Sequence, residues 1–338
     1  MSDVVQVSLA DACDLVSSAL MNVHVCKTAA MSVAAALVAA EAEGQEGHGL
    51  IRLSDYIAQV QSGKINRHAN IRVSHRGPAS LLIDADRGFA YPALDVALEK
   101  GLPVAQETGI AIMAVGNSHH CGALSVHVER VARDGLIGLM FANTPKSIAP
   151  WGGREPIFGT NPIAFAAPRR RDTPLVIDLS LSRVARGKVM AAKKAGRSIP
   201  PGWALDSDGN PTTDPDAALS GTMIPMGAAK GTALALMVEV LSAVFSASSL
   251  SVDAGSFFDA EGLSPRVGQT LIAIQPDHSS GYVSRIEALL GRILEIDGAR
   301  LPGARREHAV NVSRDKGLSL PKSLWLRVQK LATNHSSL

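Results

Sequence analysis

A histidine, an arginine and a tyrosine follow one another at four-residue spacing, at His48, Arg52 and Tyr56. Residues at i, i+4 and i+8 lie on one face of an α-helix, because the face drifts only about 40° per step. An imidazole can exchange a proton, and a guanidinium can bind a carboxylate through two parallel hydrogen bonds. Reduction of a small 2-oxo acid at C2 needs both groups. A solvated helix face or an interface contact gives the same spacing, so the pattern alone leaves these alternatives open.

A second polar stretch, GNSHHCG, contains the adjacent pair His119 and His120. It follows the apolar run IAIMAV and precedes a helical pattern, which predicts a strand-to-helix turn of the kind that often binds ligands in α/β proteins. A zinc site is the obvious hypothesis. Adjacent histidines point in different directions from a turn, and no acidic or thiol partner stands at metal spacing, so we expect no metal. A place beside a cofactor or substrate is the stronger interpretation, and simple stabilisation of the turn is the alternative.

Two glycine-containing turns add candidate ligand contacts. The stretch FGTNP, which includes Thr160, precedes the apolar run IAFAAP, and GAAKGT, which includes Lys230, opens a strongly apolar helix. A lysine and free amides at a helix N-terminus suit a phosphate or a carboxylate, although a purely structural cap is a fair alternative. The GxxxxGK[ST] spacing of a P-loop and the GxGxxG fingerprint of a Rossmann fold are both absent.

Around these motifs the chain reads as an α/β protein. The first 60 residues predict helices, with a cap at Ser8 and a break near Gly47 to Gly49, because glycine costs roughly 1 kcal/mol relative to alanine inside a helix. Later, strand-like runs alternate with helical stretches; the runs are ASLLIDAD, GIAIMAVGN, GLIGLMFANT, NPIAFAAP, PLVIDLSL and QTLIAIQP. Residues 187–221, rich in Gly, Pro, Asp and Asn, predict an extended surface excursion.

Composition sets further limits. The chain has 338 residues, of which 46% are hydrophobic and 4% aromatic, a size that favours two domains over one. The net charge is +2 without a long basic run, so nucleic acid is an unexpected partner. Three widely separated cysteines are expected to be reduced thiols. No apolar run of membrane-spanning length and no signal-peptide pattern occurs, which makes the cytoplasm the expected location.

Together these motifs resemble the type-2 malate/L-lactate dehydrogenase family, an NAD(P)-dependent group that differs in fold from the Rossmann lactate dehydrogenases. The resemblance runs nearly end to end, on GHGLIRLSDY, NSHHCGAL, FGTNPIAFAAP, VIDLSLSRVARGKV, IPPGWALDSDGNPTTDP, AAKGTALALMVE and LPGARR. It implies a non-Rossmann α/β fold in which a helical domain, residues 1–75 plus 300–338, packs on a cofactor-binding domain, residues 76–299. It also implies a homodimer.

The resemblance further implies roles for particular residues. His48 becomes the acid/base, Arg52 the clamp for the substrate carboxylate, His120 a site histidine, Thr160 a substrate contact, and Tyr56 a wall of the site. Cofactor contacts are implied for His120, Cys121, Gly122, Ala123, Asp178, Leu179, Ser180, Arg186, Gly187, Lys230, Gly303, Arg305 and Arg306. The cofactor is NADP or NAD, with NADP slightly preferred.

Two departures from the family pattern concern the substrate. A serine usually precedes the catalytic histidine, and here that position is Gly47; an aspartate of the cyclic imino acid branch is here Lys188. We therefore expect hydride transfer between the nicotinamide and C2 of a 2-oxo or 2-hydroxy acid of malate, lactate or sulfolactate type. The alternatives are an NADPH-dependent reductase of Δ1-piperideine-2-carboxylate or Δ1-pyrroline-2-carboxylate, and a binding protein of the same fold that has lost catalysis.

Overall fold

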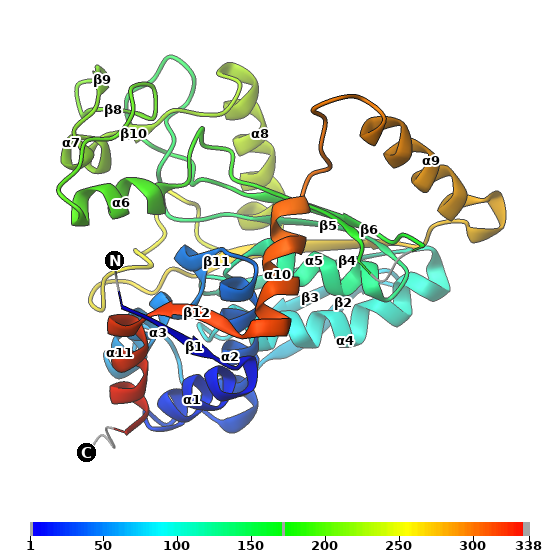
Figure 1. Cartoon of the computed structure of the whole chain (residues 1–338), viewed down its shortest axis with the longest axis horizontal. Helices are drawn as coiled ribbons and strands as arrows, with labels where there is room; N and C mark the ends of the chain where they lie inside the picture. Colours follow the sequence, from blue (N-terminus) through cyan, green and yellow to red (C-terminus); the bar gives the residue numbers. More distant parts are fainter. Residues whose placement is uncertain (1–2, 171–172, 334–338) are drawn as a thin grey trace.

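A seven-stranded sheet crosses the middle of the molecule in the computed structural model, which describes residues 3–170 and 173–333 (Figure 1). Its strand order is β2-β3-β4-β11-β5-β6-β7, and only the pair β3 and β4 runs parallel. The strands are β2 (Arg72–Gly77), β3 (Ser80–Asp84), β4 (Ile110–Ser118), β5 (Ile137–Ala142), β6 (Ile163–Ala167), β7 (Leu175–Leu179) and β11 (Val267–Ile274). The strand-like runs of the sequence all form strands of this sheet.

Two helices cover one face of this sheet. The long helix α4 (Ala90–Thr108) connects β3 to β4, and a crossover of this kind is what allows two consecutive strands to run parallel. Helix α5 (Leu124–Arg133) follows β4 and packs on β5 and β6. The two helices and the sheet share one apolar core, which includes Leu94, Met113, Val128 and Leu271. This mixed α/β architecture confirms the predicted fold class.

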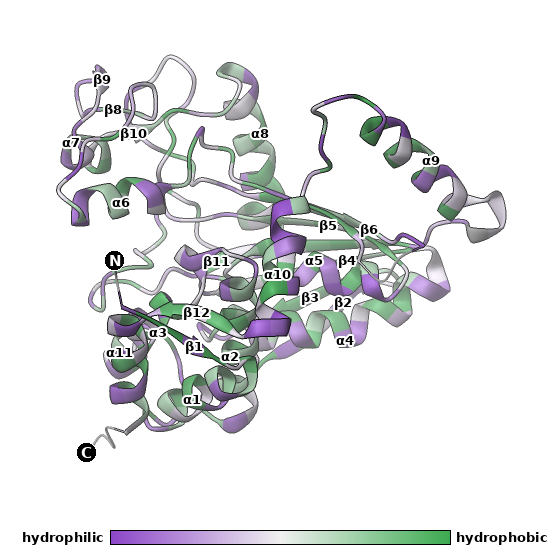
Figure 2. Cartoon of the chain, in the orientation of Figure 1, coloured by the Kyte–Doolittle hydropathy of each residue, from purple (hydrophilic) through white to green (hydrophobic). Residues whose placement is uncertain are grey.

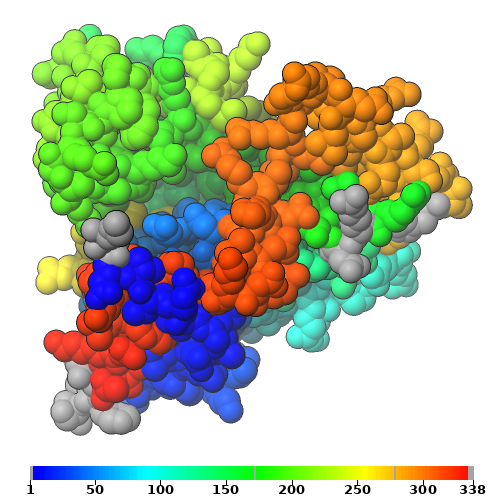
Figure 3. Space-filling view, in the orientation of Figure 1, coloured from blue at the N-terminus to red at the C-terminus, as the bar shows by residue number. Residues whose placement is uncertain are grey.

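The two ends of the chain build a second, mainly helical body. Helices α1 (Leu9–Met21), α2 (Lys27–Ala42) and α3 (Leu53–Gln61) share an apolar core with α11 (Lys322–Thr333) and with the two-stranded sheet of β1 (Val4–Val7) and β12 (Leu318–Pro321). Figure 3 shows the first and last parts of the chain side by side on the surface. The Ser8 side chain caps α1 as predicted, by accepting a hydrogen bond from the Asp11 amide. The domain boundaries at residues 75 and 300 stay a prediction.

The segment predicted as an extended surface excursion is more ordered than that. Its residues form most of α6 (Arg186–Lys194), α7 (Pro215–Ser220) and the strands β8 (Ala204–Leu205) and β9 (Pro211–Thr212), which make a three-stranded sheet with β10 (Thr222–Met223) directly after the segment. Asp214 caps α7 directly before Pro215, which suits the first helical turn. Val189, Ile199 and Met223 anchor the segment in a third apolar core. The Gly- and Pro-rich composition predicted the turns correctly but did not reveal the contacts that order them.

The remaining helices lie toward the outside. Helix α8 (Ala229–Glu239) passes into a π-helical turn (Val240–Val244), α9 (Tyr282–Leu294) projects away from the sheet, and α10 (Ala304–Lys316) leads back to the N-terminal helices (Figure 1). Short 3-10 turns lie at Glu46–His48, Leu50–Arg52 and His278–Ser280. None of the described helices is both long enough and apolar enough to cross a membrane. All three cysteines are free, as predicted.

Candidate active site

The segment that carries His48 and Arg52 is broken where glycines were expected to break it. Helix α2 ends at Ala42, two separate 3-10 turns follow, and α3 begins only at Leu53. The expectation of one continuous helix face was therefore wrong. Gly44, which has a φ of 74°, follows the end of α2, and the Glu41 carboxylate then accepts a hydrogen bond from the Leu50 amide at 2.8 Å, where a Cβ on Gly49 would overlap it. Burial raises the pKa of this carboxyl group to about 7.

The two glycines around His48 should respond very differently to alanine. At Gly49 a methyl group displaces the Glu41 carboxylate and strips the Leu50 amide of its acceptor, so we expect about 1–3 kcal/mol lower stability and weaker activity. At Gly47 nothing lies within 4 Å of an added Cβ, so Gly47→Ala should leave stability unchanged within about 0.5 kcal/mol. Urea denaturation and kcat/KM of both variants check this. Equal losses would show that the Glu41 contact does not hold the turn.

Despite the broken helix, the expected residues converge on His120. The His48 and His120 rings stack with centroids 5.3 Å apart and an interplanar angle of 21°. The Tyr56 hydroxyl lies 2.7 Å from His120 Nδ1, and the Arg52 guanidinium lies 5.6 Å from the centre of the Tyr56 ring. Tyr56 itself is fully buried. Its hydroxyl is engaged by His120 and Tyr91. That Tyr56 forms a wall facing the substrate stays a prediction.

The Arg52 guanidinium is buried and only partly occupied. One of its nitrogens, Nη2, donates to the Phe257 carbonyl at 2.6 Å, and Nη1 pairs with the Asp55 carboxylate at 2.8 Å. The Nε–H group is buried and has no hydrogen-bond partner among the described residues. A guanidinium has five N–H donors in a planar fork, so donors remain for an incoming carboxylate. The unpaired Nε–H is the kind of group that a substrate carboxylate would satisfy.

The loop that contains Phe257 and Phe258, which none of the sequence motifs includes, covers the Arg52 guanidinium. Phe257 packs against His120 with ring centroids 4.9 Å apart, and the Arg52 guanidinium lies 4.6 Å from the centre of the Phe258 ring. Main-chain carbonyls tie the loop to the segment from Arg52 to Lys64, where the donors are Arg52, Gln59, Ser62 and Lys64. The one signal in the sequence is a Phe-Phe pair in a chain that is only 4% aromatic. The loop shields His120 and Arg52 from water.

Burial keeps the site histidines neutral. Burial and the Arg52 charge lower the pKa of His48 to about 4, and burial, followed by the charges of Arg52, His48 and His119, holds the pKa of His120 well below its usual value. At pH 7 both rings therefore carry a single N–H. A neutral imidazole can accept a proton from a hydroxyl group, and a second can donate a hydrogen bond, while Arg52 holds a negative charge nearby. The group is suited to proton exchange at an oxygen next to a carboxylate.

Some of the residues expected around a cofactor meet at the start of α5, directly after His120. Cys121, Gly122 and Ala123 lead into this helix, and Asp178 accepts a hydrogen bond from the Ser125 amide at 2.8 Å, so it caps the helix. Burial raises the pKa of Asp178 to about 6. Gly303, which has a φ of 81°, packs on the Val176 carbonyl. Ser180 pairs with Ser182 at 2.7 Å, whereas Leu179 and Arg305 are exposed.

Arg306 has a structural contact of its own. Its guanidinium pairs with Glu43 at 2.9 Å and also with Glu129, so it ties α10 to α2 and α5. Both carboxylates and the arginine are largely buried, and breaking such a group leaves an uncompensated charge. A cofactor contact of Arg306 stays a prediction, and this structural role was not visible from the LPGARR motif.

A second group of expected residues lies apart, beside the third apolar core. The Thr160 carbonyl accepts a hydrogen bond from the Leu181 amide, and the Thr160 amide donates to the Thr144 hydroxyl. Arg186 opens α6 and donates to the Leu219 carbonyl at 3.1 Å, and the neighbouring Gly187 is exposed. Lys230 is exposed in the first turn of α8. Among the described residues no hydrogen bond or ion pair joins this group to His48 or His120.

The described residues contain no cluster of three or more metal-ligating side chains. His119 and His120 both pack against the rings of Tyr56 and Phe257. The ring of His119 lies edge-on to Tyr56 at 5.8 Å, and its two ring nitrogens are buried without partners in the described part of the chain. His119 is thus part of the packing that supports Tyr56 and His120.

Fold and site together define a class: a mixed α/β enzyme in which a half-buried imidazole stacks on a buried one beside a buried guanidinium, arranged for proton exchange next to a carboxylate. The sequence profile of the malate/L-lactate dehydrogenase family matches residues 7–329, and the chain belongs to this family. It is an oxidoreductase. The resemblance stated from the motifs is thereby confirmed, and so is the expectation of an enzyme.

Several relatives are similar over nearly the whole chain. The NADP-dependent (2R)-3-sulfolactate dehydrogenase of Chromohalobacter salexigens is 50% identical over 94% of this chain and 95% of its own. A Δ1-pyrroline-2-carboxylate/Δ1-piperideine-2-carboxylate reductase of Pseudomonas aeruginosa is 40% identical over 87% of this chain and 89% of its own. The crystal structure of the Δ1-piperideine-2-carboxylate reductase of Pseudomonas syringae pv. tomato has a TM-score of 0.92 at 35% identity and covers 97% of this chain and 99% of its own.

Proposed function

We propose that this protein transfers a hydride between NADP and C2 of a small 2-oxo or 2-hydroxy acid, with a 3-sulfolactate-type substrate as the first candidate. The observation that carries the proposal is the buried Arg52 with an unpaired Nε–H beside the stacked pair His48 and His120. Arg52 would bind the substrate carboxylate, and His48 would exchange the proton of the C2 oxygen. The 50% identity to an NADP-dependent sulfolactate dehydrogenase supports both the substrate class and the cofactor.

The start of α8 fits the phosphate groups of such a cofactor. Gly227 and Ala228 both have positive φ, of 63° and 56°, and the strained backbone leads into the exposed side chain of Lys230. The Thr232 hydroxyl in the same turn is buried without a partner in the described part of the chain. A cation and an unpaired hydroxyl at a helix N-terminus suit a phosphate. When bound, the nicotinamide supplies or accepts the hydride.

The second candidate is reduction of cyclic 2-imino acids, which relatives at 35–40% identity favour. Two features of this chain count against it. Gly47 offers no hydroxyl to the buried and unpartnered Nδ1 of His48, and Lys188 is an exposed residue of α6. Neither residue can replace the serine and the aspartate that the imino acid branch is expected to place around its histidine.

A substrate panel tests the proposal. Sulfopyruvate, oxaloacetate, pyruvate and Δ1-piperideine-2-carboxylate would each be offered with NADPH and with NADH, and cofactor oxidation followed by absorbance. We expect the highest kcat/KM for sulfopyruvate with NADPH. A higher kcat/KM for the cyclic imine would replace the first candidate by the second. Tight NADPH binding without turnover of any member would support the third alternative, a binding protein that has lost catalysis.

We also propose that the protein is a homodimer and that it resides in the cytoplasm. Leu236, Val240 and Val244, on α8 and its π-helical continuation, form an apolar stripe and are 48–58% exposed. In Figure 2 much of α8 has the green colour of hydrophobic residues. Exposed apolar patches on soluble proteins commonly mark an interface. The double substitution Leu236→Glu with Val244→Glu should therefore convert a dimer into a monomer in light scattering coupled to gel filtration.

A matched control is Leu326→Glu on α11, because Leu326 is 54% exposed but lies outside the stripe. It should leave the dimer intact. A wild-type mass equal to that of one chain would contradict the dimer itself. A dimer that survives the double substitution would place the interface elsewhere.

A further inference from the structure

Two buried tyrosines form a hydrogen-bond chain that ends on His120. The Tyr91 hydroxyl lies 2.9 Å from the Tyr56 hydroxyl, which in turn lies 2.7 Å from His120 Nδ1. Tyr91 belongs to α4 and Tyr56 to α3, so the chain links the two bodies of the molecule. Tyr56 and Tyr91 are both at most 2% exposed. The Arg52 guanidinium also interacts with the Tyr56 hydroxyl, and a guanidinium can only donate, so it offers no acceptor to either O–H group.

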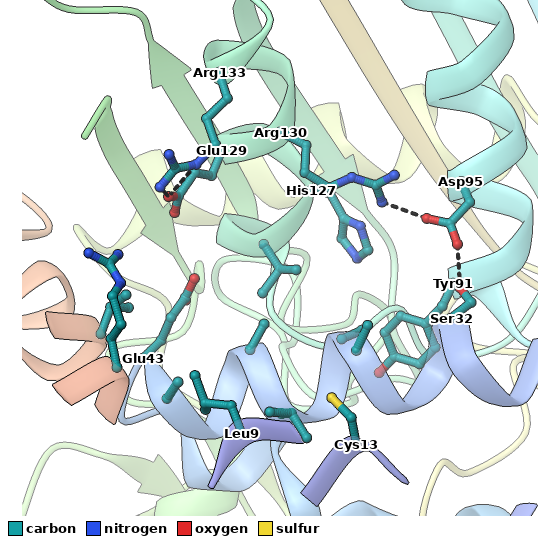
Figure 4. A pocket seen from close by; sticks show the side chains of 18 residues that line it. Leu9, Cys13, Ser32, Glu43, Tyr91, Asp95, His127, Glu129, Arg130 and Arg133 are labelled. Atoms are coloured by element: carbon teal, nitrogen blue, oxygen red, sulfur yellow. Dashed lines mark hydrogen bonds and ion pairs between the residues drawn. The ribbon is translucent and has the colours of Figure 1, made fainter. Parts of the chain in front are cut away.

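Tyr91, at the end of the hydrogen-bond chain that is farther from His120, is surrounded by other parts of the protein. Its ring contributes to the wall of a groove of about 590 Å³ between α2 and α5, beside His127 (Figure 4). Its hydroxyl instead packs against Gly122, where an added Cβ would lie 2.6 Å from the oxygen. Gly122, which has a φ of 70°, is thus the residue of the NSHHCG motif that leaves room for Tyr91. The hydroxyl thus contacts Tyr56 and lies beside Gly122, and Tyr91 as a whole is 2% exposed.

The number of O–H and N–H donors determines the direction of the two hydrogen bonds that join Tyr91, Tyr56 and His120. If Tyr91 donates to Tyr56 and Tyr56 donates to Nδ1, every O–H group in the chain has an acceptor. If Nδ1–H donates to Tyr56, then Tyr56 must donate to Tyr91, and the Tyr91 O–H is left buried without an acceptor. An unmade hydrogen bond at a buried donor costs about 1–3 kcal/mol. The first direction is therefore the stable one, and it requires Nδ1 of His120 to be unprotonated.

We propose that Tyr91 and Tyr56 are positioning residues that fix His120 as the tautomer with its proton on Nε2. Because His120 is neutral at pH 7, it has one N–H, and the chain assigns that N–H to the nitrogen opposite Tyr56. His120 then acts as a hydrogen-bond donor and never as an acceptor toward a bound molecule. A donor suits the C2 oxygen or the carboxylate oxygen of a 2-oxo acid. The assignment of that partner rests on the proposed function, whereas the tautomer does not.

The tautomer can be read directly in the free protein. Long-range ¹H–¹⁵N correlation spectra of histidine-labelled protein, without cofactor or substrate, distinguish protonated from unprotonated ring nitrogens, and His120→Gln assigns the signals. We expect the proton on Nε2 in the wild type. We expect a mixture of tautomers in Tyr56→Phe, because Nδ1 then loses its donor. Tyr282→Phe removes the hydroxyl of the third and last tyrosine of the chain, on α9, and should leave the His120 signals unchanged.

Measurements of kcat then test the effect of the tautomer on catalysis separately from the tautomer itself. Tyr56→Phe should lower kcat about tenfold and Tyr91→Phe about threefold, the size of losing or weakening one hydrogen bond. A proton on Nδ1 in the wild type, or an unchanged tautomer in Tyr56→Phe, would overturn the proposal. The predicted tautomer in a protein that turns over no member of the substrate panel would leave this inference standing and sink only the proposed function.

Discussion

Replacing Arg52 by alanine is expected to lower kcat/KM about 10³-fold, because the substrate carboxylate loses a bidentate, charge-assisted partner worth roughly 4 kcal/mol in a water-shielded site. Most of the loss should fall on KM, since a carboxylate is present in both substrate and transition state. Arg52→Lys should recover only part of the loss, because an ammonium cannot reproduce the planar fork. Initial-rate measurements with the best substrate of the panel check both variants.

The structure separates this loss from unfolding. Without Arg52 the Phe257 carbonyl still accepts from Gln59 at 2.9 Å, and the Asp55 side chain is 33% exposed and can be hydrated. The matched control is Asp55→Asn, which removes the ion pair but keeps the guanidinium. It should change kcat/KM less than about fivefold, in line with the small worth of a partly exposed pair. Near-normal KM in Arg52→Ala would remove Arg52 from the substrate site.

Replacing His48 by alanine is expected to lower kcat by about 10²–10⁴-fold with little change in KM, because the proton of the C2 oxygen loses its exchange partner. His48→Gln, which keeps polarity but cannot titrate, should be equally slow. Measuring kcat and KM for both directions checks this. If His48→Gln retained normal turnover, another group would have to exchange the proton.

The pH dependence of the wild type gives an independent test of the same role. A His48 pKa of about 4 means that the free enzyme carries a neutral base above that pH. For oxidation of a 2-hydroxy acid, kcat/KM should therefore stay level from about pH 8 down to about pH 5 and fall below it. Reduction needs protonated His48, so its kcat/KM should keep rising as the pH falls over that range.

The midpoint of the kcat profile should lie higher than that of the kcat/KM profile. A bound carboxylate neutralises the Arg52 charge, and that charge is one of the two causes of the low pKa of His48. An oxidation profile of kcat/KM with its midpoint near the ordinary histidine value of about 6.5 would contradict the lowered pKa of His48.

The local sequence pattern was enough to predict the elements that are stabilised by residues close to one another in the chain. The Ser8 cap, the six strand-like runs and the break between Gly47 and Gly49 were all predicted, because caps, period-two burial and glycine backbones act within a few residues. The order of residues 187–221 was missed, since a Gly- and Pro-rich segment looks the same in the sequence whether or not Val189 and Ile199 are anchored in a core.

By itself the sequence determined the fold class, the family and the candidate residues His48, Arg52, Tyr56 and His120, because residue types and their order along the chain carry that information. Tertiary structure decided how these residues meet. A loop more than 190 residues away covers Arg52 through the Phe257 carbonyl, and Tyr91 of α4 reaches His120 through Tyr56. Such contacts depend on packing between distant segments, and spacing along the chain does not encode them.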